Sequence, residues 1–236
     1  MTALQISPLS VLPQIRALGR HRGRNPLPLF WTASGAELLF TGSELWFQLE
    51  CDYTEIEPWV SIELNGAWIA RQALTPGRNR VCAFRGMTPG TPKHVRLLND
   101  VQPMQQDPTH FLQLNAVEYA GGEFLPLPEP RCRLEFVGDS ITSGEGTLGA
   151  RQEEDWIGAF FSAENHYARL TSDALGAEYR LVSQSVGASS AGGTMTRTIP
   201  CRPITSSLRV AEGARNTASV LNSRTIFLLG SPMQSL

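Results

Sequence analysis

Between residues 27 and 118 the chain alternates short runs of β-forming residues with turn-forming residues. Short strands at this spacing are typical of an all-β sandwich, here one of jelly-roll type. The pair Asn65-Gly66 is a strong hairpin signal, because both residues tolerate a positive φ. The predicted strands are residues 37–40, 45–49, 59–64, 80–84, 94–98 and 111–117.

Four tryptophans fall in this region, and two interpretations are open for them. Indole rings on a sandwich surface form platforms on which sugar rings stack, but in small sandwiches they more often fill the core. The core is the favoured prediction, with one exposed ring left for contact with sugar. The residues are Trp31, Trp46, Trp59 and Trp68.

A proline-rich connector at residues 126–130 separates this region from one with a different pattern. Three prolines in five residues favour a stiff, extended chain. A strand at 134–137, a loop rich in glycine and serine, a helix at 165–175 and a strand at 177–183 follow. This order predicts the opening of a parallel sheet covered on both faces. On the helix, Tyr167, Leu170, Ala174 and Leu175 share one apolar face, and Gly176 ends it.

The composition favours a globular chain with no strongly charged partner. It is 42% hydrophobic and 18% charged, with a net charge of -2. That balance argues against nucleic acid or an anionic membrane as partner. The basic residues between 16 and 24 are interpreted as a solvated segment. No stretch approaches the ~20 apolar residues of a membrane helix, and residues 1–20 lack the pattern of a secretory leader, so a cytoplasmic location is expected.

The cysteines show none of the paired spacing that zinc sites and redox motifs use. They are therefore expected to be free thiols, with no metal site and no cofactor. The residues are Cys51, Cys82, Cys132 and Cys201.

A serine follows the strand at 134–137 through the tight turn Gly138-Asp139-Ser140. Glycine permits the sharp exit from the strand. Ser140 then stands at the carboxyl end of the strand, where open α/β sheets place their sites. The alternative is an ordinary turn in which Asp139 and Ser140 cap the local backbone.

The sequence from Phe136 to Gly146, FVGDSITSGEG, resembles the first conserved block of the SGNH or GDSL-type esterases. The region upstream, with Trp31 and the strand and turn at 60–66, is similar to the N-terminal module of carbohydrate esterase family two. This resemblance covers roughly residues 25–185. It implies an organisation of N-terminal segment (1–24), β-sandwich (25–125), linker (126–130), start of an SGNH hydrolase domain (131–185) and tail (186–236).

The family resemblance implies a serine esterase that removes acetyl groups from oligo- or polysaccharides. Ser140 would be the nucleophile and would supply an oxyanion N–H. Val186 stands where the family has an oxyanion glycine, so this second donor is left open. The family takes its base from an Asp-x-x-His motif, and the chain has no histidine after His166, which is expected at the surface. A chain without that base is expected to be inactive. The alternative is a non-catalytic carbohydrate-binding or inert fragment.

Residues 186–236 lose the family pattern, and two interpretations remain open. One is a disordered tail. The other is a frameshift: read one frame over from the last base of codon 185, residues 186–197, 221–227 and 230–236 can encode stretches that resemble the family's continuation. The favoured hypothesis is that one base was lost after Ser185, leaving a poorly ordered tail.

Overall fold

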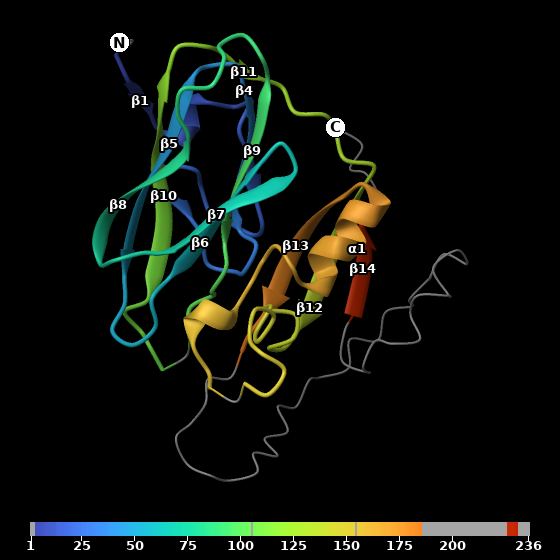
Figure 1. Ribbon diagram of the computed structural model, residues 1–236. Helices are drawn as coiled ribbons and strands as arrows, with labels where there is room; N and C mark the ends of the chain where they lie inside the picture. Colours follow the sequence, from blue (N-terminus) through green and yellow to red (C-terminus); the bar gives the residue numbers. More distant parts are fainter. Residues whose placement is uncertain (1–2, 105, 154, 186–225, 231–236) are drawn as a thin grey trace.

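The computed structural model describes residues 3–104, 106–153, 155–185 and 226–230 (Figure 1). Two antiparallel sheets face each other. The first has the order β1-β10-β5-β8, with β3 also paired to β10, and the second has the order β11-β4-β9-β6-β7, with β2 also paired to β4. The strands of the first sheet are β1 (Gln5–Ser7), β3 (Leu27–Pro28), β5 (Glu44–Asp52), β8 (Gly77–Phe84) and β10 (Phe111–Ala120). Those of the second are β2 (Arg16–Leu18), β4 (Gly35–Phe40), β6 (Trp59–Leu64), β7 (Ala67–Ala73), β9 (Lys93–Asn99) and β11 (Phe124–Leu125).

The main core lies between these two sheets. On β5 the buried residues alternate with half-buried ones, and Leu45, Phe47 and Leu49 point inward, as a strand with one covered face requires. Each of the six strands predicted from the sequence falls within a strand of the structure. The hairpin is confirmed as well, since Asn65 and Gly66 join β6 to β7 with φ values of 52° and 81°.

The prediction of a solvated basic segment holds for Arg20, His21 and Arg22, which are exposed, but not for Arg16 and Arg24, which are half-buried. The η1 turn (Leu9–Val11) and β2 pack onto the sandwich, and Leu9 is fully buried. Because β2 extends the second sheet beside β4, Arg16 meets Glu37 with an N–O distance of 2.9 Å. Arg20 donates to Glu135 at 2.8 Å. The sequence did not reveal these ion pairs because Glu37 and Glu135 are distant in the chain.

The prediction for the tryptophans is confirmed in part: one ring of the four, Trp68, is exposed, and Trp59 packs against a small apolar cluster, but none of the four lies in the main core. Trp46 and Trp59 lie at outward positions of their strands, where arginines cover them. The guanidinium carbon of Arg80 lies 3.6 Å from the ring centroid of Trp46, and that of Arg71 lies 4.1 Å from the ring centroid of Trp59. Trp68 is exposed, and Trp31 is half-buried. The smaller side chains of leucine, valine and phenylalanine fill the core instead.

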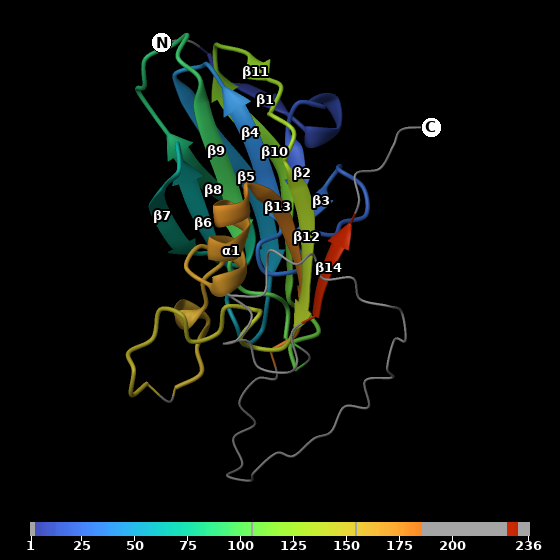
Figure 2. The same ribbon diagram turned by 90° about the vertical axis from the view of Figure 1, so that its right-hand side faces the viewer.

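A third, smaller sheet lies beside the second one (Figures 1 and 2). Its central strand, β12 (Cys132–Gly138), pairs in parallel with β13 (Ala177–Ser183), as the sequence predicts. On its other side β14 (Ile226–Gly230) pairs antiparallel, so the described part of this sheet is mixed. Phe136 and Leu181 from this sheet, with Leu18 and Leu98 from the second sheet, belong to a second apolar core.

The helix α1 (Tyr167–Leu175) packs with its polar face inward. The buried residues are Ala168, Arg169 and Ser172, while Leu170 is 60% exposed and Leu175 is 51% exposed. Of the expected apolar face only Tyr167 packs inward, with its ring centroid 5.8 Å from that of Phe136, while Leu170, Ala174 and Leu175 are exposed. α1 packs on β13 and β12 of the third sheet, and its buried Arg169 reaches across to the Glu63 carboxylate on β6 of the second sheet. Gly176 ends the helix with a φ of 61°, as predicted.

Candidate functional site

Ser140 lies in a compact turn at the carboxyl end of β12. The Ser143 N–H donates to the Asp139 carbonyl at 3.0 Å, and the Glu145 N–H donates to the Ser140 carbonyl at 3.1 Å. Within the described residues the Ser140 hydroxyl makes no hydrogen bond, and the side chain is half-buried. Its backbone is thus fixed while its oxygen is left free, an arrangement that suits a nucleophile.

Two glycines allow this turn to pack closely. A Cβ on Gly138 would lie 2.1 Å from the Thr142 Oγ1, and a Cβ on Gly144 would lie 2.3 Å from the Ser162 carbonyl oxygen. The Ser162 N–H in turn donates to the Gly144 carbonyl at 3.1 Å. The segment at 158–164, which includes η2 (Gly158–Phe160), is thereby held against the serine turn.

Gly144→Ala is expected to destabilise the protein by about 2–4 kcal/mol, because a positive φ of 79° and the steric overlap with Ser162 both oppose a side chain. Gly146→Ala is the matched control. Its φ is 70°, but no atom lies within 4 Å of the added carbon, so only about 1 kcal/mol of backbone strain is expected. Urea unfolding of both variants measures the difference. An equal loss of unfolding free energy in the two variants would show that the contact with Ser162 is not tight.

The end of β13 meets the same turn. Ser143 Oγ donates to Ser183 Oγ at 3.0 Å, and the Ser185 hydroxyl donates to the Glu145 carboxylate. Ser183 and Ser185, which flank Gln184 at the end of β13, therefore lie next to the Ser140 turn. Val186, the position expected to be the second oxyanion donor, lies outside the described residues, as does nearly all of the expected tail.

Glu145 helps to hold the serine turn in place, a role that the sequence did not reveal. Its N–H and its carboxylate join the serine turn to the end of β13. The only available signal was its place between Gly144 and Gly146, which indicates a turn but not the partner of the side chain. The partner depends on the parallel pairing of β12 and β13.

His166 is buried, and its prediction as a surface residue is wrong. It precedes α1, is 4% exposed, and neither ring nitrogen has a partner among the described residues. Burial, assisted by the Arg169 charge, lowers the pKa of His166 to about 4. The helical periodicity used for the prediction does not extend to a residue at the helix start, and this one is covered by the rings of Tyr167 and Tyr179.

No histidine is hydrogen-bonded to Ser140 within the described part of the chain. His21 contacts the Gly23 carbonyl, and His94 contacts Glu37. Like His166, His110 is buried with both ring nitrogens unpartnered. In the described residues the serine thus has no imidazole to take its proton.

The sandwich is anchored to the segment behind the site through Asp100, which is fully buried. Its carboxylate accepts hydrogen bonds from Ser61 Oγ at 2.6 Å, Arg71 Nε at 2.8 Å and the Ala163 N–H at 2.9 Å. Arg71 also donates to the Phe161 carbonyl at 2.9 Å. One carboxylate thus joins β6, β7 and the segment that supports the serine turn.

Within the residues that the structure describes, none of the histidine, cysteine, aspartate and glutamate side chains form a group of three or more able to hold a metal ion. Among the same residues no helix has the length and apolar character to cross a membrane. Cys51, Cys82 and Cys132 are free thiols, of which only Cys51 is buried.

The comparison with solved structures decides the family. An acetyl xylan esterase, Est2A from the rumen bacterium Butyrivibrio proteoclasticus, is 46% identical, with a TM-score of 0.75 over 78% of this chain. A family two carbohydrate esterase from Cellvibrio japonicus has the same fold, with a TM-score of 0.67 at 21% identity over 78% of this chain. The chain belongs to the family two carbohydrate esterases.

A third solved structure has the same fold. A family two carbohydrate esterase from Clostridium thermocellum, solved with cellohexaose, has a TM-score of 0.64 at 23% identity over 72% of this chain. The chain spans about half the length of these structures: 50% of Est2A, 53% of the Cellvibrio japonicus enzyme and 51% of the Clostridium thermocellum enzyme. No protein-family model and no curated protein sequence matches it.

Proposed function

We propose that this chain derives from a serine esterase that removes acetyl groups from carbohydrate, and that the chain as it stands is catalytically inactive. The observation that carries the proposal is the free hydroxyl of Ser140 at the end of β12, in a chain 46% identical to an acetyl xylan esterase. In this proposal the two facing sheets form a jelly-roll sandwich. The third sheet is the beginning of an SGNH-type α/β domain, divided from the sandwich at residues 126–130.

Each step of the proposed chemistry has a defined requirement. The Ser140 oxygen attacks the acetyl carbonyl carbon, the sugar hydroxyl leaves, and water then releases acetate from the acyl-enzyme. The Ser140 N–H, with the N–H at position 186, would stabilise the oxyanion. A base must take the hydroxyl proton in the first step. The buried, unprotonated His166 has no contact that would place it in this role, which supports the proposal of inactivity.

The proposed cause of inactivity is the loss of one base after codon 185. The similarity in one alternative reading frame over residues 186–197, 221–227 and 230–236 supports it. Independent reads of the genomic DNA around codon 185 test the proposal. They are expected to reveal an additional base, or Asn-Asp and Asp-x-x-His codons downstream in the alternative frame. An intact frame lacking those codons would refute it.

Incubation of this chain with p-nitrophenyl acetate is expected to give no turnover that depends on Ser140. The Ser140→Ala variant is the matched control, and because the Ser140 hydroxyl has no hydrogen bond, its free energy of unfolding should change by less than about 0.5 kcal/mol. Acetate release that disappears in Ser140→Ala would overturn the proposal of inactivity. The same assay on a gene with one base inserted after codon 185 should show that turnover.

A second candidate function is carbohydrate binding without catalysis. It is favoured by Trp68, whose ring is 41% exposed on β7 of the sandwich. Indole rings that stack on sugars need such an accessible face.

The cytoplasmic location of the protein stays a prediction.

A further inference from the structure

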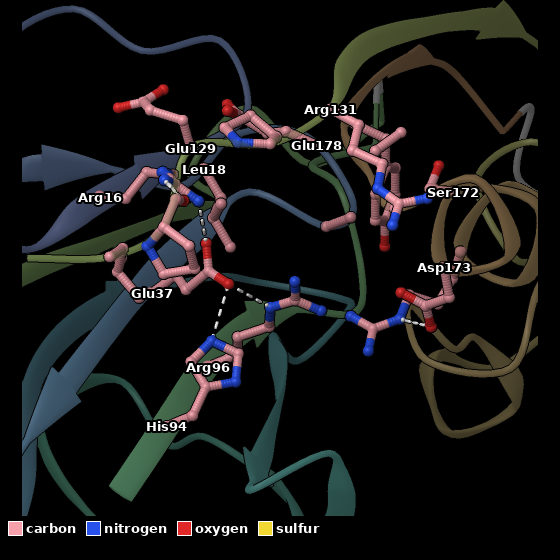
Figure 3. A pocket seen from close by; sticks show the side chains of 18 of the residues that line it. Arg16, Leu18, Glu37, His94, Arg96, Glu129, Arg131, Ser172, Asp173 and Glu178 are labelled. Atoms are coloured by element: carbon pink, nitrogen blue, oxygen red, sulfur yellow. Dashed lines mark hydrogen bonds and ion pairs between the residues drawn. The ribbon is translucent and has the colours of Figure 1, made fainter. Parts of the chain in front are cut away.

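A cavity of about 600 Å³ lies between the second sheet and α1 (Figure 3). One wall carries Arg16, Glu37 and Arg96, and the other carries Arg131 and Asp173. Residues 127–131, which include most of the connector, also line the cavity. Pockets of this size hold small ligands or short polymer segments.

The cavity is separate from the Ser140 turn. Arg131, Gly176 and Ala177 line it, and they lie at the amino ends of β12 and β13. Ser140 follows the carboxyl end of β12, a strand of 7 residues. At about 3.3 Å per residue, the two places are roughly 20 Å apart. A sugar ring bound at this end of the cavity therefore does not contact the serine.

Ionic side chains line the cavity in equal numbers of each sign. Their pairing leaves little net charge: Arg16 Nη1 and Arg96 Nε each lie 2.9 Å from Glu37, and Arg169 Nε lies 2.7 Å from Asp173. The lining arginines are Arg16, Arg96, Arg131 and Arg169, and the lining carboxylates are Glu37, Glu129, Asp173 and Glu178.

This balance selects the class of ligand. A charged ligand would need an excess of the opposite charge, which the lining does not provide. Burial raises the pKa of Glu37, but the hydrogen bond from His94 and the charges of Arg96 and Arg16 outweigh it and hold the pKa at about 2, so the carboxylate stays ionised. The walls thus present permanent acceptors beside permanent donors. Hydroxyl groups both donate and accept, and so match such walls.

Apolar side chains complete the lining. Leu18, Leu98 and Pro128 are among them, and they suit the C–H faces of a sugar ring. Arg131 supplies free donors, because within the described residues its guanidinium has neither an ion pair nor a hydrogen bond. Its aliphatic stem lies over the end of α1, since a Cβ on Gly176 would lie 3.2 Å from Arg131 Cδ.

We propose that this cavity is a second carbohydrate site, which holds a segment of an uncharged glycan chain remote from Ser140. Two sites on one chain would hold a polysaccharide more tightly than either does alone. The choice of a xylan chain as the ligand rests on the proposed function, whereas the cavity and its charge balance do not.

Titration of the full chain with xylohexaose, followed by the backbone amide signals of the ¹⁵N-labelled protein, tests the proposal. Saturable shifts are expected at Arg96, Gly176 and Ala177. Arg131→Ala should weaken this binding by about tenfold, the loss expected for hydrogen bonds from a charged group. The control is Arg78→Ala, an exposed arginine on β8 outside the cavity, which should leave the affinity within about twofold. Thermal unfolding checks that both variants are folded.

The results of this titration distinguish a failure of the second-site proposal from a failure of the proposed function. Shifts confined to residues 138–146 would show glycan binding at the serine turn alone, which overturns the second site and leaves the proposed function intact. Shifts on the first sheet, or no shifts at all, would also overturn the second site. Equal loss of affinity in Arg131→Ala and Arg78→Ala would exclude the assigned role of Arg131. The proposed function fails separately, if the chain with its frame restored releases no acetate.

Discussion

Asp100→Ala is expected to lower the free energy of unfolding by about 3–5 kcal/mol, because it leaves the Arg71 charge, the Ser61 hydroxyl and the Ala163 N–H without their buried acceptor. The effect should be largest in the segment at 158–163, which Asp100 and Arg71 hold against the sandwich. Urea unfolding measures the total cost. Limited proteolysis of the variant under native conditions should cut first in this segment.

Asp52→Ala is the matched control. Asp52 is exposed at the end of β5, and its carboxylate accepts a hydrogen bond only from the N–H of Tyr53. Its loss should cost less than about 1 kcal/mol. If Asp100→Ala cost no more than this control, the three hydrogen bonds would not be what joins the two parts of the molecule.

Glu164→Gln and His166→Phe are expected to reveal two pH dependences of the free energy of unfolding. In the unmodified protein these two dependences oppose each other. Burial raises the pKa of Glu164 from 4.5 to about 7, and burial with the Arg169 charge lowers the pKa of His166 from 6.5 to about 4. The carboxyl favours the folded state below pH 4.5 and loses this contribution as the pH rises through 7. The imidazole contributes stability above pH 6.5 and loses it as the pH falls through 4.

Each shift corresponds to about 3 kcal/mol, and between pH 4.5 and 6.5 the two slopes have opposite signs. Glu164→Gln should therefore become more stable as the pH rises over this range, while His166→Phe should become less stable. Urea unfolding at half-unit steps of pH measures both slopes. Parallel slopes in the two variants would mean that one of these side chains is solvated in the folded state.

The strands of the sandwich could be read from the sequence because their signals are local. Alternation on β5 and the turn at Asn65-Gly66 depend on residues within a few positions of each other. The same holds for the strand and turn that present Ser140, where glycine at 138 avoids contact with Thr142, four residues on. Such patterns require no knowledge of what lies across the core.

The sequence by itself thus determined the strands of the sandwich, the turn with Ser140 and the family. Only the tertiary structure decided the burial of His166, the inward face of α1, the outward tryptophans and the cavity between α1 and the second sheet. In each of these, the deciding contact joins residues far apart in the chain, such as Arg169 to Glu63 or Asp100 to Ala163. These contacts form only when distant parts of the chain meet in the folded state, so no pattern within a few neighbouring residues reports them.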